Sequence, residues 1–265
     1  MAEKLTNINL EELTSSSEEE FKKLNFDLAR GYAPYLGLNF DKDILLNLGD
    51  KAWWEADYGV KIVDGKEIGM SIKDAFRCLV DPHRTYQLAG GIREEVENIR
   101  KTRDCLTGID AGTGTGILSI LMLASGVDKV YAIEINKETY DATSDFIERL
   151  GLQGRIIMIL GDATQIYLPD LVEQKADILV SENLSAALMD EPQYEIINHL
   201  SKYLSHEGKI IPYIAQLSIS LAVADWEGVY PGKTKITERR LIKSEEFQIL
   251  YFLRVWSHKG ICLYQ

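Results

Sequence analysis

The sequence predicts an α/β protein with a mostly parallel sheet, because apolar strand and helix patterns alternate from residue 106 onward. The segments "LTGIDA", "KVYAIEI", "RIIMILGD" and "ADILVSE" are typical of buried strands. The segments "GILSILMLASG" and "NKETYDATSDFIERLG" between them are typical of helices. Alternation at this spacing favours crossover connections, with helices flanking the sheet. Such sheets bind ligands at the carboxyl ends of their strands.

The N-terminal 80 residues carry signals for helices and one hairpin. "SSSEEEFKKL" predicts a helix that begins at Ser16 or Ser17. Asp64-Gly65, between two short apolar runs, indicates a hairpin. "SIKDAFRCLV" predicts a short helix capped by Ser71. A longer helix is expected from "DPHRTYQLAGGIREEVENIRK", broken or bent near Gly90-Gly91.

The C-terminal region reads as β structure. "GKIIPYIAQLSISLAVA", residues 208–224, predicts two strands hinged at Pro212. "ERRLIKSEEFQILYFLRVW" and "GICLYQ" are rich in β-branched and aromatic residues, which favours a small antiparallel β module.

Composition limits the classes of partner. The chain has 41 acidic and 29 basic residues, a net charge of -12, which argues against binding to nucleic acid or to an anionic membrane. Three cysteines (Cys78, Cys105 and Cys262) without a C-x-x-C pair predict a reduced, cytoplasmic protein with no structural metal. The N-terminus lacks the apolar core of a signal peptide, and the longest apolar run, Ile117 to Ala124, is too short to span a bilayer.

The segment "GIDAGTGTGILS" predicts a nucleotide-type loop between a strand and its helix. Gly112, Gly114 and Gly116 allow a tight turn and a close approach of the backbone to a ligand. No lysine lies where a P-loop needs one, and Ile117 occupies the place of the third glycine of the dinucleotide motif. The remaining G-x-G-x-G form indicates a different adenosine ligand, with a purely structural turn as the alternative.

Two acids at the ends of successive predicted strands could also bind an adenosine ligand. Glu134 ends the second strand, at about the distance at which an acid reaches a ribose diol in this fold class. Asp162, which ends the third strand, is placed to accept from an adenine amino group. A solvated loop acid is the alternative for Glu134, and a helix N-cap is the alternative for Asp162.

Several spaced motifs together resemble known enzymes. "IDAGTGTGILS", "YAIEIN" and "GDAT" resemble the Rossmann-like cofactor-binding half of class I S-adenosylmethionine methyltransferases. "VSENLSAALMDE", "LSHEGKIIPYIAQL" and "DPHRT" are similar to segments of protein arginine methyltransferases. The resemblance covers roughly residues 81–222 and implies S-adenosylmethionine as cofactor. It implies that the following residues bind this cofactor: Arg84 (on its carboxylate), Asp110 (supporting the loop), Gly112, Gly114, Gly116, Glu134, Asp162 and Ala163.

Glu182 and Glu191 are the predicted catalytic residues. No lysine or arginine lies between them, so we expect acids that the protein leaves unneutralised for a cationic substrate. Two carboxylates gripping the N–H donors of a guanidinium would fix its plane and leave one nitrogen more nucleophilic. One acid would accept the proton that is released. The alternative is that Glu182 caps the loop and Glu191 begins the next helix.

These observations predict three regions: an N-terminal lid segment (1–80), a cofactor-binding domain (81–212) and a β-rich substrate module (213–265). Trp53, Trp54 and Tyr58 would contribute to the lid or to packing. The loop departs from the arginine methyltransferase pattern at residues 183–186, and the 53 residues after Pro212 are too few for that family's barrel and dimerisation arm.

We therefore expect methyl transfer to nitrogen of a small cationic guanidino or amino compound, in specialised biosynthesis. Three alternatives remain open: a reduced-size protein arginine methyltransferase, an oxygen methyltransferase, and a non-catalytic cofactor-binding subunit. The sequence is also compatible with a homodimer.

Overall fold

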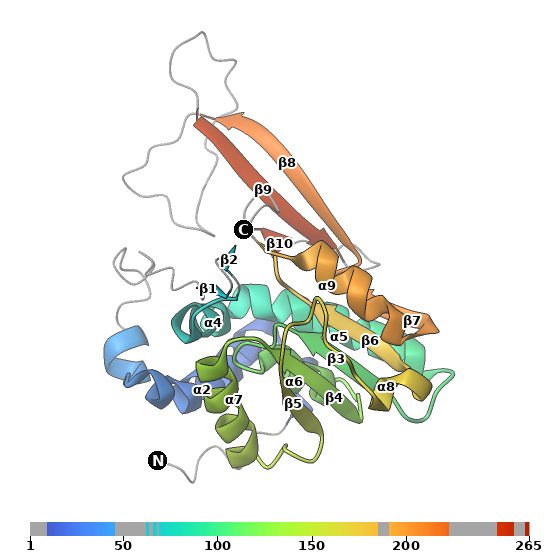
Figure 1. Ribbon diagram of the computed structural model, residues 1–265. Coiled ribbons are helices and arrows are strands. Elements are labelled where there is room, and N and C mark those ends of the chain that lie inside the picture. The colour runs from blue at the N-terminus through green and yellow to red at the C-terminus, as the bar shows by residue number, and fades with distance from the viewer. Residues whose placement is uncertain are drawn as a thin grey trace.

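A five-stranded sheet forms the centre of the protein (Figure 1). The computed structural model describes residues 10–45, 62–63, 66–67, 69–184, 191–222, 248–256 and 263–264. The sheet has the order β5-β4-β3-β6-β7, and every neighbouring pair is parallel. This arrangement confirms the predicted α/β class. The strands are β3 (Thr107–Ala111), β4 (Lys129–Glu134), β5 (Ile156–Leu160), β6 (Ala176–Ser181) and β7 (Leu204–Ile211).

The three central strands β4, β3 and β6 are largely buried on both faces, because their residues alternate between two hydrophobic clusters. Val130 packs into one hydrophobic cluster and its neighbour Tyr131 into the other; Ile178 and Leu179 divide in the same way. Every residue of β6 is buried. The helices that flank the sheet are α5 (Pro82–Arg100), α6 (Ile117–Ala124), α7 (Lys137–Arg149), α8 (Asp170–Glu173) and α9 (Gln193–Leu200), with a 3-10 turn at Ser201–Tyr203.

The N-terminal elements form as their capping signals predict. Helix α2 (Glu18–Tyr32) begins after Ser17, whose side chain makes a reciprocal capping box with Glu20. Helix α4 (Ile72–Leu79) is capped by Ser71, whose hydroxyl accepts from the backbone of Asp74. Strands β1 (Ile62–Val63) and β2 (Lys66–Glu67) pair antiparallel, which confirms the hairpin. The remaining turns are α1 (Glu12–Ser15), a 3-10 turn at Ala33–Leu36 and a π turn at Phe40–Leu45.

Helix α5 continues without interruption from Pro82 to Arg100. The predicted break at Gly90-Gly91 is therefore wrong. Gly91 is buried in the helix, where the lack of a side chain allows close packing, and the apolar contacts along the same face outweigh the low helix propensity of two glycines.

Tyr32 joins the N-terminal region to the glycine turn. Its ring is fully buried and packs against Phe76 and Phe146. Its hydroxyl lies 2.8 Å from Thr143 Oγ1, which donates in turn to the carbonyl of Gly114 at 2.6 Å. Helix α2 is thus part of the main hydrophobic core. The division at residue 80 remains a prediction, and the predicted lid residues Trp53, Trp54 and Tyr58 lie outside the described residues.

A second sheet follows the cis peptide bond between Ile211 and Pro212. Strands β8 (Ile214–Ala222), β9 (Gln248–Trp256) and β10 (Leu263–Tyr264) are antiparallel in the order β10-β9-β8, drawn in orange and red in Figure 1. The strands on either side of Pro212 and the antiparallel C-terminal module are confirmed.

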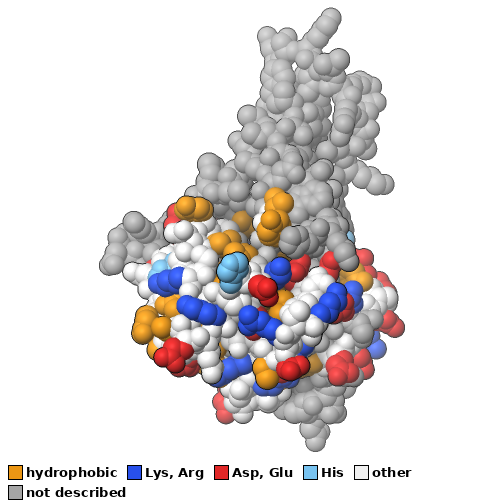
Figure 2. Space-filling model, turned by 90° about the vertical axis from the view of Figure 1, so that its right-hand side faces the viewer, with side chains coloured by type: hydrophobic (Ala, Val, Ile, Leu, Met, Phe, Trp, Pro, Cys, Tyr) orange, Lys and Arg blue, Asp and Glu red, His pale blue; other side chains and the backbone are white. Residues whose placement is uncertain are grey.

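The described surface carries charges of both signs, interspersed over the face shown in Figure 2. No helix within the described part of the chain is both long enough and apolar enough to cross a membrane.

Substituting Tyr32→Phe should lower the free energy of unfolding by about 1 kcal/mol, because one buried hydrogen bond is lost while the ring packing stays. Urea unfolding measures this change. Tyr194→Phe is the matched control because Tyr194 is 77% exposed. Equal stability of Tyr32→Phe and the wild type would show that the hydroxyl does not tie α2 to the glycine turn.

Candidate cofactor and acceptor site

The turn from β3 to α6 is built on glycines with positive φ angles. Gly112, Gly114 and Gly116 have φ values of 73°, 53° and 81°. The backbone N–H groups of Gly112 and Thr113 both donate to the carbonyl of Ile133, at 3.0 and 2.9 Å, which holds the turn against the end of β4. A Cβ atom on Gly112 would lie only 2.3 Å from Oδ1 of Asn183. Glycine is therefore required there for both conformation and space.

Glu134 ends β4 beside this turn and is almost fully buried. Its Oε2 accepts from the N–H of Gly114 at 3.0 Å, and its Oε1 accepts from the N–H of Asn136 at 2.7 Å. Burial raises the pKa of the Glu134 carboxyl, while the backbone hydrogen bonds act in the opposite direction. Because a carboxylate offers about four acceptor positions, these two bonds leave capacity for ligand hydroxyls.

Asp110 lies beneath the glycine turn, at the end of β3. Its Oδ2 accepts from the hydroxyls of Thr113 and Ser119, each at 2.7 Å. Its Oδ1 is buried without a hydrogen-bond partner. Burial raises the pKa of the Asp110 carboxyl. The side chain thus contacts the turn that it was predicted to support.

Asp162, after β5, makes local hydrogen bonds. Its Oδ1 accepts from the N–H and hydroxyl of Thr164, and its Oδ2 accepts from the side-chain amide of Gln165. These bonds close a turn, and no helix begins at Asp162, so the alternative of a helix N-cap is wrong. Ala163 beside it is buried in the second hydrophobic cluster. Contact of Asp162 and Ala163 with an adenine stays a prediction.

Arg84, in the first turn of α5, forms an ion pair with Glu182, directly after β6. The pair is largely shielded from solvent, with side-chain exposures of 13% and 6%. The expectation that the protein leaves Glu182 unneutralised is therefore wrong. The compensating arginine lies 98 positions earlier in the chain and reaches Glu182 only through the packing of α5. No neighbouring residue in the sequence could reveal it.

Glu191 comes just before α9. Burial raises the pKa of the Cys78 thiol, while the charge of Arg84 lowers this pKa and the charge of Glu191 raises it. Residues 185–190 between the two acids lie outside the described residues, and a joint action of Glu182 and Glu191 on one substrate stays a prediction.

Sequence reasoning missed three polar residues around Glu182. The side chains of Ser181, Asn183 and Gln193 form a hydrogen-bonded cluster at the end of β6. Asn183 also donates to the carbonyl of Ala111, at the end of β3. The available signal was Asn183, one of the residues 183–186 at which the loop departs from the arginine methyltransferase pattern.

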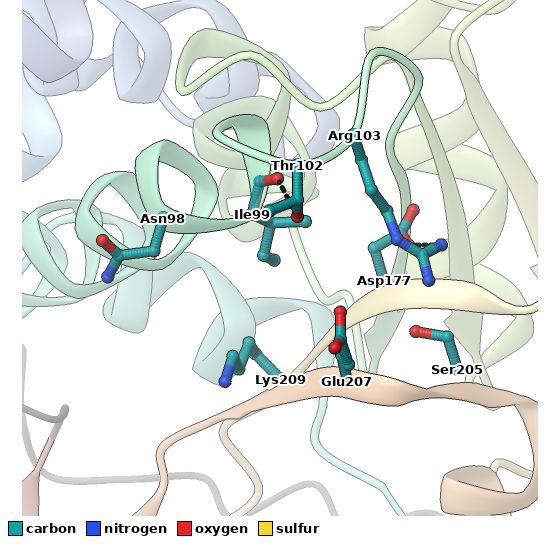
Figure 3. A pocket seen from close by; sticks show the side chains of 8 residues that line it. All are labelled: Asn98, Ile99, Thr102, Arg103, Asp177, Ser205, Glu207 and Lys209. Carbon is teal, nitrogen blue, oxygen red and sulfur yellow. Dashed lines mark hydrogen bonds and ion pairs between the residues drawn. The ribbon is translucent and has the colours of Figure 1, made fainter.

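A polar hollow of ≈ 290 Å³ lies at the opposite end of the sheet (Figure 3). The end of α5 and the early residues of β6 and β7 line it, and the ion pair between Arg103 and Asp177 occupies one side. Because Asp177 stands near the amino end of β6, this hollow has no part in the candidate site.

The described residues fit an adenosine cofactor with an amino-acid tail. The glycine turn gives close backbone approach, Glu134 keeps acceptor capacity for ribose hydroxyls, and Arg84 can bind a carboxylate. A parallel α/β sheet with this site at its carboxyl edge is a Rossmann-like arrangement, which binds nucleotide cofactors at that edge.

Comparison with known proteins agrees with this class. Residues 83–212 match the family model described as "Ribosomal protein L11 methyltransferase (PrmA)". This part of the chain is therefore similar to a family of methyltransferases.

Three curated relatives show the extent of the similarity. Protein arginine N-methyltransferase 7 of Gallus gallus is 30% identical over 160 residues, covering 58% of this chain and 23% of the relative. An uncharacterized protein of Methanocaldococcus jannaschii is 36% identical over 139 residues, covering 52% and 49%. Histone-arginine methyltransferase CARMER of Aedes aegypti is 35% identical over 112 residues, covering 42% and 18%. The chain spans less than half of the length of each.

Among solved structures, a Trypanosoma brucei PRMT1 enzyme-prozyme complex with AdoHcy aligns with a TM-score of 0.49 and 21% identity, covering 56% of this chain and 44% of that one. Arabidopsis thaliana protein arginine methyltransferase 10 aligns with a TM-score of 0.46 and 24% identity, covering 54% and 39%.

Gly112→Ala should weaken S-adenosylhomocysteine binding at least about tenfold, because the added methyl group collides with Asn183 and distorts the turn. Calorimetric titration measures the affinity. Gly151→Ala is the matched control: its φ is 70°, but nothing lies within 4 Å of the added carbon. It should cost about 1 kcal/mol of stability and leave affinity unchanged. Equal affinity of Gly112→Ala and wild type would exclude the turn from the cofactor site.

Asp110 should make stability depend on pH. Because burial raises its pKa in the folded state, the folded protein binds this proton more tightly than the unfolded chain does. Its contribution therefore stabilises folding at low pH and is lost as the pH rises through the raised pKa. Relative to Asp110→Asn, the wild type should gain stability in urea unfolding as the pH falls from about 7 toward the ordinary aspartate pKa of 3.8. A difference that is constant or reversed would contradict the raised pKa.

Proposed function

We propose that this chain transfers the methyl group of S-adenosylmethionine to a nitrogen of a small guanidino or amino compound, with a guanidinium as the favoured group. One observation carries the proposal: Glu182, at the carboxyl end of β6, already pairs with a guanidinium in a shielded position beside the cofactor turn. An acid that binds the arginine of its own chain there has the charge and the surroundings to bind a substrate guanidinium.

The location of Glu182 suits a group-transfer site. Strand β6 pairs directly with β3, and Ser181 lies opposite Ala111, the residue before the glycine turn. The acid and the cofactor turn therefore leave the same edge of the sheet on adjacent strands. The nucleophile and the methyl donor would meet with little further movement, which is the main requirement of a transfer in which the cofactor carries the reactive group.

The acids would then act on the acceptor. When bound, S-adenosylmethionine supplies a methyl group on a positively charged sulfur, and the carbon–sulfur bond breaks as the new carbon–nitrogen bond forms. Glu182 and Glu191 would accept hydrogen bonds from the guanidinium, orient one nitrogen toward the methyl group, and receive the proton that this nitrogen loses.

Arg84 must share Glu182 with the substrate or leave it. The ion pair uses Oε2 of Glu182, and a carboxylate has about four acceptor positions, so a second guanidinium can be accommodated. Alternatively, Arg84 turns to the cofactor carboxylate, which is the role that the resemblance implies.

Arginine in a protein is a second candidate acceptor, which the names of the relatives favour. Two of the three relatives above carry names of arginine methyltransferases, and their aligned regions cover 58% and 42% of this chain. The acidic net charge of -12 would attract a basic peptide as well as a small cation.

Transfer from tritium-labelled S-adenosylmethionine distinguishes these acceptors. The full chain is incubated with L-arginine, agmatine, a primary amine and an arginine-rich peptide. Labelling of the free guanidines supports the proposal, and labelling of the peptide alone supports the second candidate. A chain that binds the cofactor yet methylates none of these compounds would overturn both.

Glu182→Gln and Glu191→Gln should each reduce kcat at least about a hundredfold, because a neutral amide neither accepts the proton nor attracts the cation. Affinity for S-adenosylhomocysteine should survive. Glu195→Gln, on an exposed residue of α9, is the control and should leave kcat unchanged. Full activity of both acid variants would exclude these residues from the chemistry.

A further inference from the structure

The side chain of Gln193 joins the residues before and after the loop that carries the two acids. Gln193, the first residue of α9, lies two positions after Glu191. Its Oε1 accepts from the hydroxyl of Ser181 at 3.0 Å and from the backbone N–H of Asn183 at 2.9 Å. Its Nε2 donates to the carbonyl of Ser181 at 2.7 Å. Three hydrogen bonds therefore tie the residues on both sides of Glu182 to the start of α9.

Asn183 connects this closure to the cofactor turn. Its Nδ2 donates to the carbonyl of Ala111 at 2.7 Å and to the hydroxyl of Ser181 at 3.0 Å. Its Oδ1 faces the position that a side chain on Gly112 would occupy. The ends of β3 and β6, the acidic loop and the glycine turn are thus linked through adjacent hydrogen bonds.

We propose that Gln193 is a positioning residue, which acts with Asn183 to hold Glu182 in register with the cofactor turn. The inference rests on the proposed function. Gln193 suits this task because its amide group both accepts and donates; it satisfies the backbone N–H of Asn183 and the carbonyl of Ser181, which lie on either side of Glu182. The backbone at Glu182 therefore cannot move away from the sheet edge unless these bonds break.

Gln193 and Asn183 contact different sides of the site, so their substitution should have different effects. Within the described part of the chain, the side chain of Gln193 forms hydrogen bonds with Ser181 and Asn183, on the acceptor side. Asn183 contacts Ala111 and faces Gly112, on the cofactor side. Loss of the Gln193 amide should therefore impair use of the acceptor and spare the cofactor.

Amide hydrogen exchange followed by NMR tests the closure without any substrate. Gln193→Met keeps the length of the side chain but removes its hydrogen bonds, so the Asn183 amide should exchange at least about tenfold faster. Gln193→Glu keeps an acceptor for the Asn183 N–H but loses the donor to the Ser181 carbonyl, so it should restore only part of the protection. Gln174→Met, an exposed glutamine before the other end of β6, is the matched control and should leave the Asn183 amide unchanged. Protected amides in β3 and β4 confirm that each variant is folded.

Kinetics then test positioning. With the acceptor that the full chain methylates, Gln193→Met should lower kcat/KM at least about tenfold, with S-adenosylhomocysteine affinity unchanged and only partial recovery in Gln193→Glu. Unchanged exchange at Asn183 in a folded Gln193→Met, or faster exchange with unchanged kcat/KM, would overturn the inference. If the wild type methylates no acceptor, the proposed function fails and the positioning role falls with it, while the exchange rates still decide whether the closure exists.

Discussion

The turn between β3 and α6 is the constraint on which the rest of the site depends. Its path requires positive φ angles at three glycines, and at Gly112 there is no space for even one further carbon atom. The turn is held from several directions, by the carbonyl of Ile133, the carboxylate of Glu134 and the Thr143 hydroxyl. A conformation that costs backbone freedom is stable here because neighbouring elements fix it.

Those contacts explain why distant segments are needed for one site. Tyr32 of α2 supports Thr143, and the side chain of Asn136 donates to the carbonyl of Met70, just before α4. The N-terminal helices therefore pack against the loops that follow β3 and β4. The PrmA-like region begins at residue 83, but its cofactor turn takes structural support from residues before it.

Local patterns in the sequence were sufficient to predict the strands, most helices and the glycine turn. Ser17 and Ser71 signal helix starts through side chains that act within three residues, so no tertiary information is needed. The strands show continuous apolar runs because both faces of a parallel sheet are covered. The break at Gly90-Gly91 was wrong because packing along α5 overrides local propensity.

The electrostatics of the site could not be predicted in the same way. Glu182 contacts Arg84 only because α5 lies against the end of β6. Gln193 contacts Asn183 only because the start of α9 lies beside the same strand end. Asp162 shows a local case: its side chain closes a turn, where the sequence allowed a helix N-cap or contact with an adenine. Contacts between residues far apart in the chain depend on the register of the sheet, which a single sequence does not encode in any short motif.

The account depends most on Glu134 holding the ribose of a sulfonium nucleoside beside the glycine turn. Calorimetric titration of the full chain with S-adenosylhomocysteine and with its 2′,3′-dideoxyribose analogue tests this directly. Because each hydroxyl bond to a charged acceptor is worth about 1.5–3 kcal/mol, the analogue should bind more than about tenfold more weakly. Equal affinity for the two compounds, or no binding of either to folded protein, would contradict the account.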